Sequence, residues 1–336
     1  MKQYNVAILG ATGAVGREMM KVLEERDLPI AELRLLASER SAGTVLSFNG
    51  RDITVRAAAD DAFEGIDFVL GAAQADLARR FAPAIKASGA VFVDNSSAFR
   101  MDPEVPLVVP EINPEDAFAH KGVISNPNCS TIITLMAVSA INRISPIRTM
   151  VASTYQAVSG AGIGGFRELE AQTRAYAEGT EAPAAVFPYQ IAFNLIPQIG
   201  SDTGNGYTTE EMKMQNEGRK ILHLPELTVT CTCVRVPVMR SHSISVQLVT
   251  ERKVSVDEAR AAIAANRGCR LVDDLDAKLY PMPLDTSDQD LVFVGRIRDD
   301  LTNDRGLALW CCGDQVRKGA ATNAVQIVGL LMEQAK

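Results

Sequence analysis

The chain has 336 residues, of which 47% are hydrophobic and 22% are charged, and its formal net charge is −7 at pH 7. This length suffices for two domains with separate cores, because domains typically contain ~100–150 residues. The negative charge argues against a nucleic-acid-binding surface. No apolar run approaches the ~20 residues that a bilayer span needs, and the first residues lead directly into an expected strand, without a signal peptide.

The six cysteines contain no C-x-x-C pair. Since we expect no secretion signal, we expect these cysteines to be reduced and the protein to be cytoplasmic. Cys231 and Cys233 would share one face of a strand, but no pair of histidines lies nearby, so no metal site is predicted.

A glycine-rich turn, GATGAVG at 10–16, follows an expected strand at 5–9 and precedes an expected helix. Strand, glycine turn and helix together are typical of a dinucleotide site, because glycines let the backbone approach a pyrophosphate at the helix N-terminus. The spacing is G-x-x-G-x-x-G rather than G-x-G-x-x-G, and a tight structural turn is the alternative. We predict cofactor contacts from Gly10, Thr12, Gly13, Ala14 and Val15.

The end of the second expected strand, at 33–37, bears on the choice between NAD and NADP. Glu39 has the spacing of the acid that binds the ribose hydroxyls of NAD. Ser38, Arg40 and Ser41 surround it and suit a 2′-phosphate better, because a guanidinium binds phosphate through a planar fork. NADP is therefore favoured, although spacing alone leaves the choice open.

Strands and helices continue to alternate, with strands expected at 67–71 and 90–94 and a helix at 75–88 that Pro83 could kink. This alternation predicts a Rossmann-like, doubly wound parallel sheet, in which ligands bind beyond the carboxyl ends of the strands. Arg100 follows such an end. It is a candidate for binding an anion, and a solvated surface arginine is the alternative.

Cys129 lies between an expected strand at 122–125 and an expected helix at 131–141. Pro127 favours an extended backbone before it, and Asn128 is a candidate N-cap. The first turn of a helix favours a thiolate, and its N–H groups can hold the oxyanion that forms when a thiolate attacks a carbonyl. A buried structural cysteine is the alternative.

The character of the sequence changes after this helix. A strand at 148–157 is followed by a glycine-rich segment at 159–165, which we expect to be flexible. Few helices separate the later strands, so we predict a mostly antiparallel sheet in a second, α+β domain; these strands are at 226–237, 243–250, 290–297 and 307–312. The last helix, about 319–333, is expected to pack on the first domain. The predicted domains are therefore 1–128, completed by 315–336, and 129–314.

The chain resembles the aspartate-β-semialdehyde dehydrogenase family along essentially its whole length. Seven stretches carry the resemblance: GATGAVG at 10–16, DNSSAFR at 94–100, NPNCST at 126–131, STYQAVSGAG at 153–162, EEMK at 210–213, CVRVPVMRSHS at 233–243 and FVGRIRDD at 293–300. The serine and arginine cluster at 38–41 also resembles the NADP-phosphate contacts of one branch of the family. The turn at 71–76, GAAQAD, departs from the family's serine-rich turn, which puts hydroxyl contacts to the cofactor in doubt.

The resemblance implies reduction of β-aspartyl phosphate by NADPH to the semialdehyde, through a thioester on Cys129. It implies that Gln156 positions the substrate, that His242 is the acid–base group and that Asn128 orients the carbonyl or the nicotinamide. The domain at 1–128 would bind NADP and the domain at 129–314 would carry catalysis and form a homodimer. We expect Cys129 to react fastest of the cysteines, its thiolate being stabilised by a nearby His242 imidazolium.

For the substrate, the resemblance implies that Arg235 binds the carboxylate and that Glu210 lies near the amino group. Arg100 and Lys213 would bind phosphate. Cofactor contacts are further expected from Ser159, Gly160 and Gln315.

These assignments have structural alternatives. His242 could be a structural hydrogen-bonding residue, although His120 and His223 have less polar neighbours in the sequence. Arg235 could be exposed, and Glu210 with Lys213 could be a surface ion pair. Two other functions remain open: N-acetyl-γ-glutamyl-phosphate reductase, against which the EEMK and RVPVMRSHS stretches argue, and a paralogue that binds NADP without turnover.

Overall fold

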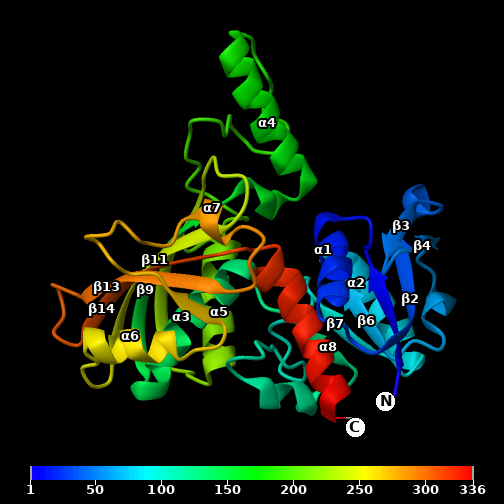
Figure 1. The fold of residues 1–336 in the computed structure, drawn as a ribbon, viewed down its shortest axis with the longest axis horizontal. Helices are drawn as coiled ribbons and strands as arrows, with labels where there is room; N and C mark the ends of the chain where they lie inside the picture. The colour runs from blue at the N-terminus through cyan, green and yellow to red at the C-terminus, as the bar shows by residue number, and fades with distance from the viewer. Residues whose placement is uncertain (1, 335–336) are drawn as a thin grey trace. The chain divides into compact units, whose positions relative to one another are not determined.

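A computed structural model of the chain describes residues 2–334. The chain divides into two compact units, Met1–Asn128 with Ala320–Lys336, and Cys129–Gly319. Figure 1 shows the first unit in blue, cyan and red, and the second from green to orange. Among the described residues, no helix is both long enough and apolar enough to cross a membrane.

The first unit contains a six-stranded sheet in the order β5-β2-β1-β6-β7-β8. Every neighbouring pair in it is parallel, which confirms the predicted doubly wound fold. The strands are short apolar runs because both faces of a parallel sheet are covered. They are β1 (Tyr4–Leu9), β2 (Ile30–Ala37), β5 (Arg56–Ala57), β6 (Phe68–Gly71), β7 (Val91–Asp94) and β8 (Val123–Ser125).

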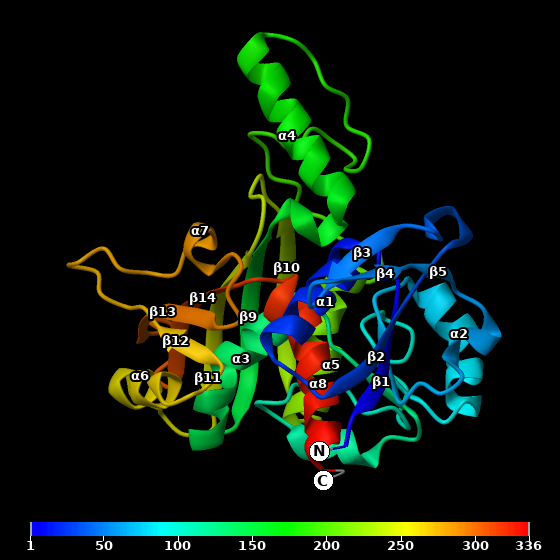
Figure 2. The same ribbon diagram turned by 45° about the vertical axis from the view of Figure 1, so that its right-hand side comes forward.

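Two hydrophobic clusters cover the two faces of this sheet. Val6 and Ile8 of β1 belong to one cluster, with α1 (Ala14–Glu25) and α8 (Thr322–Gln334). Ala7 and Leu9 belong to the other, with α2 (Ala75–Ala87), because successive strand residues point to opposite faces. Helices α1 and α8 lie side by side (Figures 1 and 2), so the C-terminal helix completes the core of the first unit. Pro83 lies inside α2 without ending it.

Shorter elements connect these layers. The hairpin of β3 (Val45–Phe48) and β4 (Arg51–Thr54) turns at Asn49 and Gly50, whose φ angles of 48° and 71° suit a tight two-residue turn. The helical turns of the unit are η1 (Glu39–Ser41), η2 (Asp60–Phe63) and η3 (Pro114–Ala119).

The second unit contains a six-stranded sheet in the order β10-β9-β11-β14-β13-β12. The three central pairs are antiparallel, whereas β10 pairs with β9 and β12 with β13 in parallel, so the sheet is mixed. A connection that contains helices brings β10 back parallel to β9. The strands are β9 (Ile147–Gln156), β10 (Thr228–Arg235), β11 (His242–Thr250), β12 (Cys269–Leu271), β13 (Val292–Asp299) and β14 (Gly306–Gly313).

Helix α3 (Cys129–Ile144) is the core helix of this unit. It packs against β9, β11, β13 and β14 and between α5 (Thr209–Leu222) and α6 (Val256–Ala264). All of its residues from 130 to 141 are buried, which explains why its apolar residues form no single stripe. A last short helix, α7 (Pro283–Thr286), precedes β13.

The segment at 159–165, expected to be flexible, has regular secondary structure. It forms η4 (Val158–Ala161) and the first turn of α4 (Ile163–Glu178), joined at Gly162 with φ 74°. Figure 1 shows α4 projecting from the sheet of its unit. Buried Glu168 accepts hydrogen bonds from the backbone N–H groups of 185–187 and holds that segment on α4.

Candidate active site

Cys129 is the first residue of α3 and is partly exposed, whereas the other five cysteines are buried. The helix dipole favours a thiolate at this position. The backbone at Gly319 passes close to Cys129: a Cβ added to Gly319 would lie 2.9 Å from the Cβ of Cys129. Gly319 belongs to a π-helical turn, η5 (Arg317–Ala321), an irregularity frequent at functional sites. Cys129 is the accessible thiol.

Three side chains of the second unit form a hydrogen-bonded chain. Buried Gln156, at the end of β9, donates from Nε2 to Glu210 Oε1 at 3.2 Å. Glu210 Oε2 pairs with Lys213 Nζ at 2.8 Å, one turn later on α5. The ion pair that was the structural alternative for Glu210 and Lys213 is therefore present, and it is joined to the buried Gln156.

Arg235, the last residue of β10, is buried, so the alternative of an exposed arginine is wrong. Its Nη1 donates to the carbonyl of Ala157 at 2.7 Å. Burial lowers the pKa of Arg235, and the nearby Cys129 and Glu210 oppose that shift. A guanidinium thus lies near both the candidate nucleophile and the carboxylate of Glu210, where it can bind an anionic group of a ligand.

His242, the first residue of β11, is completely buried. Its Nδ1 accepts a hydrogen bond from the backbone N–H of Ala157 at 3.0 Å, so the proton of the neutral ring lies on Nε2. Nε2 has no hydrogen-bond partner within the described residues. Burial, with a smaller contribution from Arg235, lowers the pKa of His242 to about 3. The expected imidazolium is therefore wrong: His242 is neutral at neutral pH, because desolvation disfavours its charged form.

Gly160, in η4, permits these side chains to approach. A Cβ at this position would lie 2.7 Å from Arg235 Nη1 and 3.4 Å from both Cε1 and Nε2 of His242. Gly160 therefore lines the same cluster as Arg235 and His242, and its lack of a side chain leaves space beside the polar atoms.

The candidate site residues of the first unit lie around Arg100, at the glycine turn and at the end of β2. Arg100 is buried, which excludes the solvated arginine; its Nε donates to the carbonyl of Asn126 at 3.0 Å and its Nη2 to that of Asn95 at 2.6 Å. The side-chain amide of Asn323 on α8 in turn donates to Asn126 Oδ1 at 2.7 Å. Arg100 is thus fixed beyond the carboxyl end of β7.

The glycine turn between β1 and α1 holds a second set of candidate residues. Gly10 has φ 94°, and a Cβ there would lie 2.6 Å from the carbonyl oxygen of Ala72. Gly13 is the N-cap of α1 without a side-chain cap, so the first N–H groups of α1 are available to an anion. Thr12, Gly13, Ala14 and Val15 are all partly exposed. This backbone fits the pyrophosphate of a dinucleotide.

The turn at 71–76 packs tightly at its first residue and against the glycine turn. A Cβ at Gly71 would lie 2.6 Å from the ring of Phe92, and the carbonyl of Ala72 abuts Gly10. Nothing in the structure explains why the following positions lack serine. At the end of β2, Ser38 and Arg40 are exposed and Ser41 is half-buried in η1.

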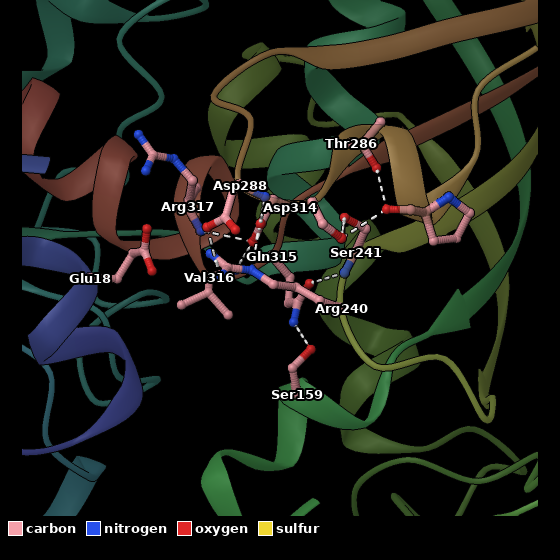
Figure 3. Close-up of polar contacts among 12 residues, drawn as sticks. Glu18, Ser159, Arg240, Ser241, Thr286, Asp288, Asp314, Gln315, Val316 and Arg317 are labelled. Atoms are coloured by element: carbon pink, nitrogen blue, oxygen red, sulfur yellow. Dashed lines mark hydrogen bonds and ion pairs between the residues drawn. The ribbon is translucent and has the colours of Figure 1, made fainter. Parts of the chain in front are cut away.

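Gln315 and Ser159 contact each other (Figure 3). Gln315 donates from Nε2 to Ser159 Oγ and accepts from the backbone N–H of Ser241 at 2.8 Å. Beside them, the carboxylate of Asp314 is fully buried and pairs with Arg240 Nε at 2.6 Å. Sequence reasoning missed Asp314 and Arg240. The one available signal was that Asp314 directly precedes Gln315 and that Arg240 lies two residues before His242.

The comparisons with known proteins agree with this arrangement. Residues 5–120 match the family Semialdehyde dehydrogenase, NAD binding domain, and residues 139–318 match Semialdehyde dehydrogenase, dimerisation domain. Aspartate-semialdehyde dehydrogenase of Synechocystis sp. is 51% identical over 98% of this chain and 97% of its own. The chain belongs to the aspartate-semialdehyde dehydrogenase family. The resemblance drawn from its motifs is confirmed.

Other relatives extend this likeness to the whole chain and to its fold. Aspartate-semialdehyde dehydrogenase of Aquifex aeolicus is 50% identical over 98% of both chains. The crystal structure of aspartate semialdehyde dehydrogenase II from Vibrio cholerae complexed with ASA superposes with a TM-score of 0.97, at 43% identity and covering 99% of both chains. The first unit of this protein is accordingly a nucleotide-binding, Rossmann-type domain.

Proposed function

We propose that the protein catalyses the reversible, NADPH-dependent reductive dephosphorylation of L-4-aspartyl phosphate to L-aspartate 4-semialdehyde, a step in the synthesis of lysine, threonine and methionine. One observation carries this proposal: a partly exposed cysteine at a helix N-terminus lies close to a buried arginine, Arg235, in the same unit as a buried neutral His242. Relatives at about half identity are named for this activity.

In the biosynthetic direction, the thiolate of Cys129 attacks the acyl carbon of aspartyl phosphate. The C–O bond to phosphate breaks, phosphate leaves with its electron pair, and a thioester remains on Sγ. NADPH supplies a hydride when bound. The hemithioacetal oxyanion that follows collapses by breaking the C–S bond, which releases the aldehyde and restores the thiolate. The N–H groups of the first turn of α3 stabilise the negative oxygen in both steps.

Substrate recognition uses the charged side chains of the second unit. The guanidinium of Arg235 binds the α-carboxylate through its fork, and Glu210 receives the α-ammonium group. Gln156 donates to Glu210 at 3.2 Å in the free protein. It is therefore placed to exchange that bond for one to the substrate and to hold the acyl group against Cys129.

His242 acts in its neutral form. The Nε2–H is a buried donor without a protein partner, and Gly160 leaves room beside it. It donates a hydrogen bond to the sulfur or to the developing oxyanion and stabilises the negative charge there, while Nδ1 stays engaged with the N–H of Ala157.

The first unit supplies the cofactor site. Gly10, Thr12, Gly13, Ala14 and Val15 hold the pyrophosphate at the N-terminus of α1. Ser38, Arg40 and Ser41 hold the 2′-phosphate that distinguishes NADP from NAD. Asn128, Ser159, Gly160 and Gln315 are assigned to the nicotinamide end.

The departing phosphate is assigned to Arg100 and Lys213. Arg100 is already held by two backbone carbonyls, which orients its guanidinium. Lys213 is paired with Glu210, so it shares its charge between that carboxylate and a bound phosphate.

The second unit also carries the proposed dimer surface. One face of its sheet is left with partly exposed apolar side chains, among them Val151 and Tyr155 of β9, and Tyr155 packs on Trp310 of β14 with ring centroids 5.3 Å apart. We assign this face to a second copy of the chain, since a contiguous exposed apolar patch marks an interaction surface.

The test is phosphate-dependent reduction of NADP with two aldehydes, aspartate semialdehyde and N-acetylglutamate semialdehyde. The proposal expects turnover with the aspartate compound and none, or far less, with the acetylated one. The reverse preference would assign the protein to N-acetyl-γ-glutamyl phosphate reduction. NADP binding in a titration without turnover of either aldehyde would show a non-catalytic paralogue.

A further inference from the structure

We propose that Gln315 is a positioning residue for His242: its side-chain amide ties the turn at Ser159 to the turn at Ser241, the two backbone segments that hold the imidazole. This role adds to the cofactor contact assigned above. It rests on the proposed function only in giving His242 a part in the reaction.

The strand register places Gln315 beside the residues that precede His242. In the antiparallel pair of β11 and β14, His242 lies opposite Gly313. The residues just before His242 therefore run beside those just after Gly313. The ion pair of Arg240 Nε with Asp314 Oδ2, at 2.6 Å, joins the two strand ends, and the carboxylate of Asp314 also accepts from the N–H groups of Asp288, Val316 and Arg317 (Figure 3).

Ser241 needs such support. Its φ is 76°, a left-handed conformation that a serine seldom adopts without other interactions. Its backbone N–H donates to Gln315 Oε1 at 2.8 Å, and its hydroxyl lies 3.2 Å from that of Ser287. Because Ser241 directly precedes His242, the backbone direction at Ser241 decides where the imidazole enters the site.

The other end of the amide reaches the second segment. Gln315 Nε2 donates to Ser159 Oγ, in η4. Ala157, two residues earlier, donates its N–H to His242 Nδ1 at 3.0 Å. Backbone bonds from Val158 to Val238 and from Ser159 to Met239 run alongside. Gln315 thus holds together the segment that carries His242 and the segment that fixes its tautomer.

The protonation state of His242 depends on the charged groups that face it and on its burial. Arg235 comes from β10 and disfavours an imidazolium, whereas Glu210 comes from α5 and favours one. Burial outweighs both and keeps the ring neutral. If the Ser241 and Ser159 turns separated, water would reach the ring, its pKa would rise toward the ordinary range, and the Nε2–H would lose its fixed direction.

The test uses Ser159→Ala, Gln315→Met and the double variant, with Gln326→Met as the matched control. Gln326 is a glutamine of α8 whose amide also donates to a side chain, Glu111 Oε1 at 2.8 Å. Ser159→Ala removes one hydroxyl and leaves the fold intact. Ser159→Thr keeps the hydroxyl and is expected to restore the behaviour of the parent protein.

The primary readout does not depend on activity. The chain has three histidines, so ¹⁵N-labelled histidine gives a small set of ring signals, and His242→Asn identifies that of His242. In the parent protein this signal should keep the Nε2–H tautomer from pH 8 to pH 5. In Ser159→Ala and Gln315→Met it should titrate within that range, and in Gln326→Met it should not. An unchanged His242 signal in both variants would overturn the proposal.

Kinetics provide the second readout. A positioning role predicts that kcat falls about tenfold or more in each single variant and that the double variant is no worse than the worse single one. Additive losses, or a raised KM for NADPH with kcat preserved, would make Gln315 a cofactor ligand alone. A failure of the proposed function would be distinguishable from a failure of this proposal. In that case the parent protein would show no turnover, but its His242 signal would still respond to the substitutions.

Discussion

Nδ1 of His242 accepts a hydrogen bond from the backbone N–H of Ala157 at 3.0 Å, whereas Nε2 has no hydrogen-bond partner among the described residues. A neutral ring with one fixed nitrogen and one donating nitrogen is suited to act on a thiolate or an oxyanion without carrying a charge itself. The arrangement has consequences for stability as well as for turnover.

Stability should depend on the protonation of His242. Its pKa is lowered to about 3 by burial, whereas the unfolded chain has the ordinary value of 6.5. Between these values the unfolded state binds more protons, so the free energy of unfolding falls as the pH falls, by at most about 1.4 kcal/mol per pH unit. Urea unfolding from pH 7 to pH 4.5 should show a smaller loss in His242→Gln than in the parent protein. Identical losses would contradict a buried neutral His242.

Gly160→Ala should impair catalysis without unfolding the protein. The added Cβ would lie 2.7 Å from Arg235 Nη1 and would displace the guanidinium. We expect kcat/KM for the semialdehyde to fall about tenfold or more, because small misplacements of a binding group are costly. Gly218→Ala is the control: its Cβ would meet Leu227 at an ordinary 3.4 Å inside α5. Equal activity in the two variants would argue against a role in catalysis for the close packing of Gly160 against Arg235.

Arg235→Lys should keep the charge and lose most of the activity. A lysine cannot both donate to the carbonyl of Ala157 and present a planar fork to a carboxylate. We expect a loss of about 10²-fold in kcat/KM. Arg148→Lys, an exposed arginine of β9, should leave the rate unchanged. A near-normal rate for Arg235→Lys would remove Arg235 from the substrate site.

Arg40→Ala should raise the KM for NADPH far more than it lowers kcat. A charge-assisted bond to the 2′-phosphate contributes equally to the ground and transition states, and its loss should raise KM about tenfold or more. Arg80→Ala, at an exposed arginine of α2 in the same unit, serves as the control. If Arg40→Ala kept its preference for NADPH over NADH, Arg40 would be a surface residue and Glu39 would be the residue that binds the ribose.

The alternation of apolar strands and helices was sufficient to predict the first unit. Its strands are buried on both faces and read as short apolar runs, and the glycine turn at 10–16 has a conformation at Gly10 that only glycine adopts readily. The parallel pairing of β9 and β10 could not be predicted, because alternating apolar residues do not encode strand direction. Helix α4 was not predicted, because two glycines follow its first residue, Ile163, and disfavour a helix there.

In the site, residue types and motif positions could be predicted, but protonation could not. His242 was expected to be charged; its neutral state follows from complete burial beside Arg235, which only the folded chain produces. The tie from Gln315 to Ser159 spans 156 positions in the sequence, and no local pattern reports it. Conversely, Cys311 and Cys312 end the strand expected at 307–312, and both are buried, as its apolar sequence suggests.

The most direct test of the account is the covalent intermediate on Cys129. Intact mass followed by peptide mapping, after brief exposure to aspartyl phosphate without NADPH, should show one aspartyl group added on Cys129, and Cys129→Ser should show none. The other five cysteines are buried, and burial raises the pKa of Cys311 and of Cys312, while a hydrogen bond with Cys233, together with burial, raises the pKa of Cys231, so these cysteines should stay unmodified. An adduct on another cysteine, or full turnover by Cys129→Ser, would contradict the assignment of the active site.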